Sequence, residues 1–205
     1  KGILTAHVLV AFSTLSAQAA LVWVEAETAT VQKVHRNAWW DALRRDGLSG
    51  SDLVASFSEP DQPTGSATIA FRIPEAGTYA FWARLAASGT GYAYELDGGQ
   101  AVPIDVKALK QFDKDNQRTK DYQRRFLDER NLAIDGTTDA RYYAWVLVDT
   151  LGLSPGEHTL SFSLGGSEDE KRFGAVDAIV FTNEPFTPNG QFKPGETNPL
   201  EQTLD

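Results

Sequence analysis

The chain contains no cysteine and only three histidines among its 205 residues. The absence of cysteine excludes disulfide bridges, a thiol nucleophile and any thiolate metal site. His7, His35 and His158 stand outside any His-Glu-x-x-His pattern, and neither a Gly-x-Ser-x-Gly motif nor a phosphate loop occurs. The sequence therefore predicts a protein that is not an enzyme. A carboxylate pair for glycoside hydrolysis stays open, because pairing in space is invisible in a sequence.

Basic residues are few relative to acidic ones, which gives a formal net charge of −9. Leaving out the first 20 residues removes Lys1, so 18 basic residues face 28 acidic ones. A field of this sign repels nucleic acid and anionic membrane surfaces. We expect no nucleic-acid partner, and a neutral polymer or a calcium-bridged ligand fits better.

Residues 1–20 read as a secretory signal peptide. Lys1 gives a positive start, residues 3–15 are mostly apolar, and Ala17-Gln18-Ala19 is a small-residue cleavage pattern. An uncleaved anchor or a strand donated to a neighbouring molecule is the alternative. No other stretch reaches the roughly 18 apolar residues of a membrane span. We predict a secreted or cell-surface protein with no membrane insertion after cleavage.

Residues 21–186 read as one all-β domain. Short runs of strand-forming residues alternate with turn signals such as Pro74-Glu-Ala-Gly77, and Asp97-Gly98 predicts a tight hairpin. The expected strands are 22–31, 53–58, 66–73, 78–86, 91–96, 143–149, 157–164 and 174–182. Eight strands at this spacing predict a β-sandwich of jelly-roll type.

Residues 105–141 interrupt this pattern as a charged insertion, with nine basic and eight acidic residues. Asp121 with Arg125 and Arg124 with Asp128 stand four residues apart, which predicts a short helix at 116–130. The charges are either a solvated face or part of a binding region. Residues 187–205, rich in proline, glycine and polar side chains, are expected to form a tail or linker.

Three carboxylates stand in the first and last expected strands. Glu25 and Glu27 share one face by the two-residue period of a strand, and Asp177 shares a face with Ile179 and Phe181. If these strands are neighbours, three hard oxygen donors converge, a set that suits calcium better than zinc. The alternative is that they are solvent-facing acids on edge strands.

Exposed aromatic rings are what a sugar-binding surface requires, because sugar C–H groups pack on flat rings. Trp39 and Trp40 are adjacent and point in different directions, so at most one of them is expected to be buried. Tyr92 and Tyr94 share a strand face and are further candidates. For any single aromatic side chain, core packing is the competing interpretation.

The order of motifs resembles the calcium-containing jelly-roll carbohydrate-binding modules of families 6 and 35. The matching segments are Val24-Glu-Ala-Glu27, Ile73-Pro-Glu-Ala-Gly-Thr-Tyr79 with Trp82-Ala-Arg84, Tyr142-Tyr-Ala-Trp145, Leu153-Ser-Pro-Gly-Glu-His-Thr-Leu160 and Val176-Asp-Ala-Ile-Val180. The resemblance covers residues 22–182 apart from the insertion.

The resemblance implies a structural calcium ion held by Glu25, Glu27 and Asp177. It also implies a sugar platform at Tyr142, with Trp145 in the core. Family 6 members often carry a sugar-bonding Asn two residues before the final-strand Asp, where this chain has Ala175. The nearby Lys171 and Arg172 are the expected substitutes, although the insertion could equally cover this site.

The sequence thus predicts non-catalytic binding of a polysaccharide or glycan, with Tyr142, Trp39, Trp40, Tyr92 and Arg172 as candidate ligand-binding residues. A structural subunit of a surface assembly is the alternative. It would self-associate through the sandwich, or through an uncleaved N-terminal segment added to a neighbour's sheet edge.

Overall fold

A computed structural model describes residues 19–87, 90–104, 126–136, 141–166 and 171–196 of the chain. The expected signal segment up to residue 18, most of the insertion and the last nine residues lie outside these ranges. Among the described residues, no helix has the length and apolar character needed to cross a membrane.

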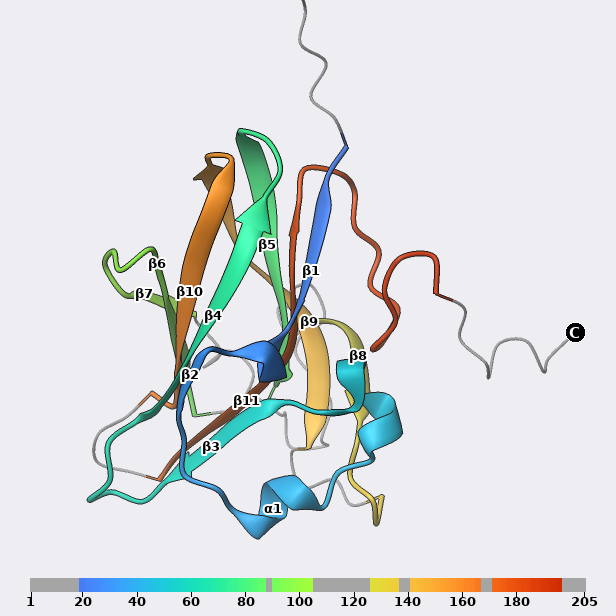
Figure 1. Cartoon of the computed structure of the whole chain (residues 1–205). Coiled ribbons are helices and arrows are strands. Elements are labelled where there is room, and N and C mark those ends of the chain that lie inside the picture. The colour runs from blue at the N-terminus through green and yellow to red at the C-terminus, as the bar shows by residue number, and fades with distance from the viewer. Residues whose placement is uncertain (1–18, 88–89, 105–125, 137–140, 167–170, 197–205) are drawn as a thin grey trace, which may run out of the picture.

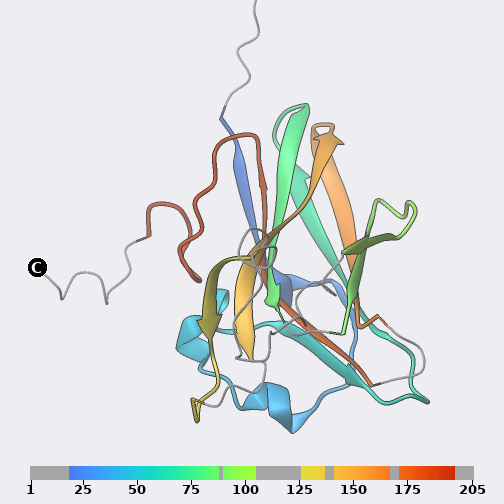
Figure 2. The ribbon, with the colours of Figure 1, turned by 180° about the vertical axis from the view of Figure 1, so that it is seen from behind.

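Two antiparallel sheets pack face to face, which confirms the β-sandwich of jelly-roll type (Figures 1 and 2). The six-stranded sheet has the order β1-β11-β5-β9-β8, with β3 also paired to β11, and the five-stranded sheet has the order β2-β4-β10-β6-β7. The strands are β1 (Leu21–Glu25), β2 (Val31–Lys33), β3 (Val54–Ser58), β4 (Gly65–Ile73), β5 (Gly77–Ala86), β6 (Tyr92–Leu96), β7 (Val102–Ile104), β8 (Phe126–Asn131), β9 (Tyr142–Leu153), β10 (Gly156–Leu164) and β11 (Arg172–Thr182). The helical turns are η1 (Ala26–Thr28), α1 (Ala38–Asp41), η2 (Arg45–Gly47) and η3 (Ser49–Ser51).

Aromatic rings from both sheets fill the space between them. Phe181 of β11 stacks on Phe71 of β4 with 4.2 Å between ring centroids, and on Phe81 of β5 at 5.0 Å. On β4, buried and less buried residues alternate, as a strand with one solvent-facing side requires. Hydrophobic burial between the sheets is therefore the main stabilising contribution.

The outer face of the six-stranded sheet is covered as well. The segment from α1 to η3 lies over its lower part in Figure 1, where Trp40, Leu43 and Leu48 pack against Tyr143 and Ala175. As a result, every residue of β11 except Phe173 is buried. β11 thus reads as a nearly continuous apolar run, unlike β4.

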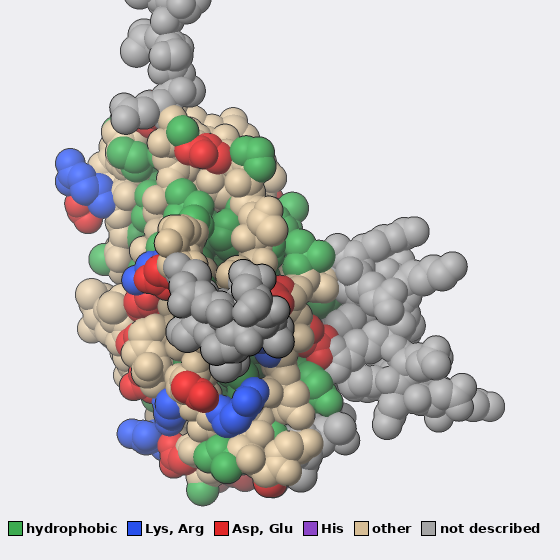
Figure 3. Space-filling view, turned by 90° about the vertical axis from the view of Figure 1, so that its right-hand side faces the viewer, with side chains coloured by type: hydrophobic (Ala, Val, Ile, Leu, Met, Phe, Trp, Pro, Cys, Tyr) green, Lys and Arg blue, Asp and Glu red, His purple; other side chains and the backbone are tan. Residues whose placement is uncertain are grey.

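The other part of this cover is the segment that follows β11, residues 183–196, which we call the strap. Phe186 packs edge-on against Trp82 and Trp145, and Trp145 donates a hydrogen bond from Nε1 to the Gly190 carbonyl at 2.8 Å. Residues 187–196, expected to be a tail or linker, therefore lie along the domain as far as they are described. On this side, Lys and Arg side chains lie beside Asp and Glu, with apolar side chains between them (Figure 3).

One strand prediction and one helix prediction need correction. The expected strand 22–31 breaks at η1, so β1 joins the six-stranded sheet and β2 joins the five-stranded sheet. Residues 126–130, the end of the helix expected at 116–130, form β8 instead, while residues 116–125 lie outside the described ranges. The side chain of Phe126 is buried in the core next to Val146 of β9, and this tertiary pairing outweighs the local helical spacing.

Candidate functional site

Four aromatic rings form a cluster at the α1 end of the sandwich. We call Trp39, Trp40, Phe57 and Phe173 the aromatic cluster. Trp39 lies 4.5 Å from Trp40 and 5.8 Å from Phe173 between ring centroids, and Phe57 stacks on Phe173 at 5.5 Å with 13° between the planes. Trp39, Phe57 and Phe173 are only half-buried, so parts of three rings face solvent.

The single turn of α1 separates its two tryptophans. Asn37 caps the turn, because its side-chain Oδ1 accepts a hydrogen bond from the Trp39 backbone N–H at 2.9 Å. Trp40 points inward, where its indole Nε1 donates to the Ser56 carbonyl at 3.2 Å, and it is 4% exposed. Trp39 stays half-buried, which confirms that at most one of the pair is buried.

Two cations flank the cluster. The guanidinium carbon of Arg141 lies 5.8 Å from the centroid of the Trp39 ring, and Nζ of Lys171 lies 5.6 Å from that of Phe57. Arg141 is buried and donates to the Ala42 carbonyl, so it is held in place beneath the ring. Lys171 is exposed and pairs with Glu59 at 3.4 Å. Flat apolar surface thus lies next to one exposed hydrogen-bond donor, the Lys171 ammonium.

The other predicted ligand residues are not members of the aromatic cluster. Tyr142 is half-buried against the main core between the sheets. Tyr92 is 4% exposed, and its hydroxyl donates to the Ala86 carbonyl at 2.9 Å and accepts from the Ala175 N–H at 3.1 Å. Arg172 is 4% exposed and donates to the Glu59 and Gln62 carbonyls, which ties β11 to the turn after β3. The structure gives Tyr92 and Arg172 structural positions.

A cavity of about 200 Å³ opens beside α1. Its lining includes Trp40, Asp41, Arg45 and Asp52. Arg45 pairs with both Asp41 and Asp52, so these charges largely satisfy one another. The only aromatic side chain among its described lining residues is the buried Trp40, so this cavity lacks a ring for stacking.

The predicted metal ligands Glu25 and Glu27 come together around Gly50. Gly50 has φ +59°, and a Cβ on it would collide with the Glu27 carboxylate and lie 3.6 Å from Cδ of Glu25. The Oε2 atoms of both glutamates are buried without a hydrogen-bond partner. Burial raises the pKa of the Glu27 carboxyl, and the nearby charges of Glu25 and Asp52 add to this rise. The Glu25–Glu27 pair would therefore be stabilised by additional positive charge.

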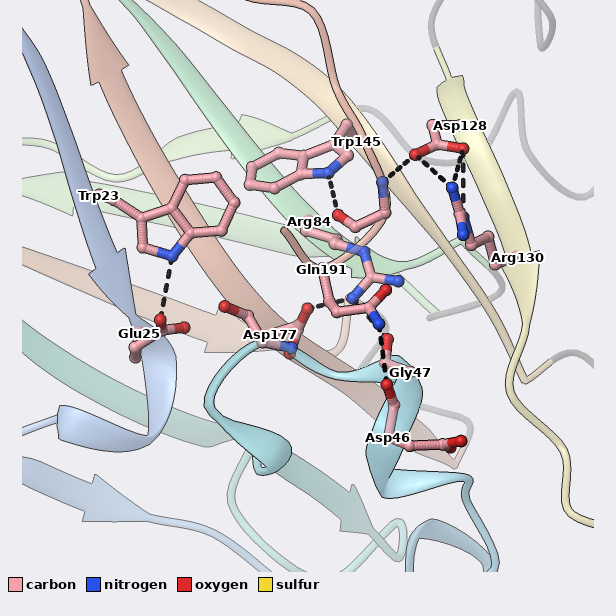
Figure 4. A network of polar contacts seen from close by, with 12 residues as sticks. Trp23, Glu25, Asp46, Gly47, Arg84, Asp128, Arg130, Trp145, Asp177 and Gln191 are labelled. Carbon is pink, nitrogen blue, oxygen red and sulfur yellow. Dashed lines mark hydrogen bonds and ion pairs between the residues drawn. The ribbon is translucent and has the colours of Figure 1, made fainter. Parts of the chain in front are cut away.

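Asp177, the third predicted ligand, faces a different partner. A register shift between Val176 and Ala178 interrupts the strand alternation, so Asp177 meets Arg84 while Ile179 and Phe181 fill the core (Figure 4). Its Oδ1 also accepts from the Ser49 N–H at 3.0 Å. Burial raises its pKa to about 7, although Arg84 lowers it. The side chain is fully buried and out of reach of a substrate, which argues against a catalytic role.

The donors around Glu25 and Glu27 fit a hard divalent cation. Carboxylate oxygens are what calcium prefers, two of them are unpaired, and only a glycine fits at position 50. No three His, Cys, Asp or Glu side chains in the described ranges are grouped closely enough to hold a metal ion by themselves. Any calcium ion would thus need carbonyl or water oxygens beside the glutamate pair.

Several residues of these sites escaped the sequence reasoning. Phe57 alternates with Ser56 and Ser58, a pattern that by itself favours a buried phenylalanine, whereas in the structure the two serines are the fully buried residues. No sequence pattern indicated Phe173 or Arg141, since only the fold brings them beside Trp39. Arg84 stood in a recognised motif, but its partner Asp177 is 93 residues away.

No protein-family model and no curated protein sequence matches the chain. Among solved structures it is similar to a family 35 carbohydrate-binding module from Clostridium thermocellum, with 14% identity and a TM-score of 0.42 over 78% of this chain and 97% of that module. A family 35 module from an environmental isolate has 12% identity and a TM-score of 0.47, over 82% and 93% of the two chains. A GH26-CBM35 β-(1,4)-mannanase from Podospora anserina has 16% identity and a TM-score of 0.46, over 82% of this chain and 29% of the enzyme. The chain spans less than a third of that enzyme's length.

Proposed function

We propose that the chain is a non-catalytic carbohydrate-binding domain of a secreted or cell-surface protein, and that its sugar-contacting surface is the aromatic cluster. The supporting observation is the set of three half-buried rings, Trp39, Phe57 and Phe173, with cations beside them. Sugar C–H groups pack on such rings, while hydroxyls bond to the flanking polar groups. Contacts of this kind give Kd values of about micromolar to millimolar, or roughly −8 to −4 kcal/mol.

The test is retention of the domain on a panel of immobilised polysaccharides in the presence of calcium. We expect retention on one or a few glycans and a loss of at least about tenfold in affinity for Trp39→Ala. Trp82→Ala is the matched control, because Trp82 is also a half-buried tryptophan but belongs to the separate cluster under the strap. Equal loss in both variants, or retention on no glycan by folded protein, would contradict the proposal and favour the assembly subunit.

The second part of the proposal is a structural calcium ion at Glu25 and Glu27. Bound calcium would neutralise the pair and join β1 to the η3 turn, which would stabilise the sandwich. At 100 times its Kd, a ligand specific for the folded state stabilises by about 2.7 kcal/mol, which raises Tm by roughly 5–10 °C for a chain of this size. Differential scanning calorimetry with calcium and with chelator measures this shift. Glu27→Gln should abolish it, and an unchanged Tm in the unsubstituted protein would contradict the calcium site.

A further inference from the structure

The strap brings a lysine to the same glutamate pair. Nζ of Lys193 lies 2.9 Å from Oε1 of Glu25, and this contact raises the pKa of Lys193. The same Oε1 accepts a hydrogen bond from Nε1 of Trp23 at 3.1 Å. One oxygen of Glu25 therefore has two donors, whereas its second oxygen has none.

The lysine is held in position by the strap's own hydrogen bonds. The strap is anchored just before it, where Gly190 donates to Asp128 and accepts from Trp145, and where Gln191 donates to the Asp46 carbonyl at 2.8 Å (Figure 4). Gly190 has φ +53°, and a Cβ there would lie 2.8 Å from Cζ of Arg130. The anchor therefore requires glycine.

A second turn follows the anchor and presents the lysine. The Glu196 N–H donates to the Lys193 carbonyl at 2.9 Å, and Oε2 of Glu196 accepts from the Lys193 N–H at 2.9 Å. Lys193 lies only two residues after Gln191, so its backbone stays close to the hydrogen bond that anchors Gln191 to Asp46. Lys193 thus reaches Glu25 from a fixed base, while its side chain remains 44% exposed and able to leave.

One monovalent cation does not satisfy two carboxylates. Lys193 bonds to one oxygen of Glu25, and the unpaired Oε2 of Glu27 shows the demand that remains. A divalent ion would bring two charges and several coordination positions to the same oxygens. Lysine and calcium cannot both bond to Glu25 without close repulsion.

We propose that Lys193 is an internal cation that calcium displaces from the Glu25–Glu27 pair, so that calcium binding releases the last turn of the strap, residues 193–196, while Gly190 and Gln191 stay anchored. This inference rests on the calcium site proposed above. The order of the last turn of the strap would then depend on calcium, and the calcium affinity would depend on Lys193, a residue outside the sandwich.

The first test is calorimetric titration of the chelator-treated chain with calcium. Partly exposed ion pairs are worth about 0.2–1 kcal/mol, so Lys193→Met should bind calcium about 1.4- to 5-fold more tightly than the unsubstituted chain at low salt. The gain should shrink as salt screens the pair. Arg72→Met is the matched control, because it removes an exposed cation paired with Glu157 on the five-stranded sheet and should leave the affinity unchanged.

The second test follows the strap directly by ¹⁵N relaxation. On addition of calcium, the amides of Gly195 and Glu196 should become more mobile, whereas that of Gln191 should not. If both chains bind calcium equally tightly and residues 195–196 keep their order, the calcium site stands and this inference is wrong. If neither chain binds calcium, the calcium proposal fails, and this inference fails with it.

Discussion

Within the described part of the chain, the six-stranded sheet is covered on both faces, whereas the five-stranded sheet is covered on its inner face only. The outer face of the first carries the aromatic cluster, the Arg84–Asp177 pair and the strap. The outer face of the second carries short polar side chains such as Thr68 and Ser161, hydrogen-bonded to each other at 2.8 Å. A second cover is what lets a sheet hold buried charges and shaped surfaces, because only there is water excluded from both sides.

The largest expected difference between the two faces concerns their ion pairs. Arg84 and Asp177 are fully buried, whereas Arg72 and Glu157 on the five-stranded sheet are 73% and 67% exposed. Arg84→Met leaves a buried carboxylate without its cation and should cost about 3–5 kcal/mol. Arg72→Met should cost less than about 1 kcal/mol. Urea denaturation at pH 8 measures both, and similar costs would show that the outer cover does not exclude water.

A middle-sized effect is expected where the strap covers the sheet. Phe186→Ala removes a half-buried ring from Trp82 and Trp145 and should cost about 1–2 kcal/mol. Val102→Ala, on the exposed strand β7, should stay within about 0.5 kcal/mol. Thermal unfolding of the two variants measures the difference in stability between them. If the Phe186 variant is as stable as the Val102 variant, the packing of the strap on the sheet contributes little to the free energy of unfolding.

The smallest expected effect is a pH dependence of the free energy of unfolding, caused by His158 at the rim of the five-stranded sheet. His158 of β10 hydrogen-bonds to the Ser154 carbonyl at 2.8 Å and to Asp97 at 2.7 Å, and both contacts raise its pKa. The folded state therefore holds the proton more tightly than the unfolded chain. The resulting contribution of His158 to the free energy of unfolding is fully present below pH 6.5, and it is lost as pH rises through the pKa of the folded state.

Unfolding free energies measured from pH 7 to 8.5 should fall for the unsubstituted chain and stay flatter for His158→Gln. Asp177, whose folded pKa is about 7, works in the same direction at the lower end of this window, but it does so in both chains, so the difference between them reports on His158. A slope that persists unchanged in the variant would place the titrating group elsewhere.

The two sheets also differ in how well their sequences predicted them. On β4 and β10 one face is apolar and the other polar, so the alternation alone located Ser66–Ile73 and Glu157–Leu164 to within a residue of their ends. The last strand was expected at 174–182 and begins at Arg172, because Phe173 lies on the outer, covered face, where polarity gives no boundary.

The candidate sites were less predictable because their geometry comes from departures from regular strands. The two-residue period put Glu25 and Glu27 on one strand face, but η1 separates them, and it is the Gly50 turn that brings both carboxylates together. The register shift at Asp177 turned the third carboxylate to Arg84. Trp39 was found because adjacent aromatics must diverge, whereas Tyr92 has hydroxyl partners that no local pattern reveals.

The pairing of β1 with β11 has a kinetic consequence. Leu21 lies opposite Thr182, and Glu25 opposite Ala178, so the first described strand joins the sheet only after almost all of the described chain has been made. Contacts between such distant segments slow folding, because the connecting chain must lose its freedom first. The domain should therefore fold slowly, and until that step the edge of β11 that receives β1 is exposed to pairing with other chains.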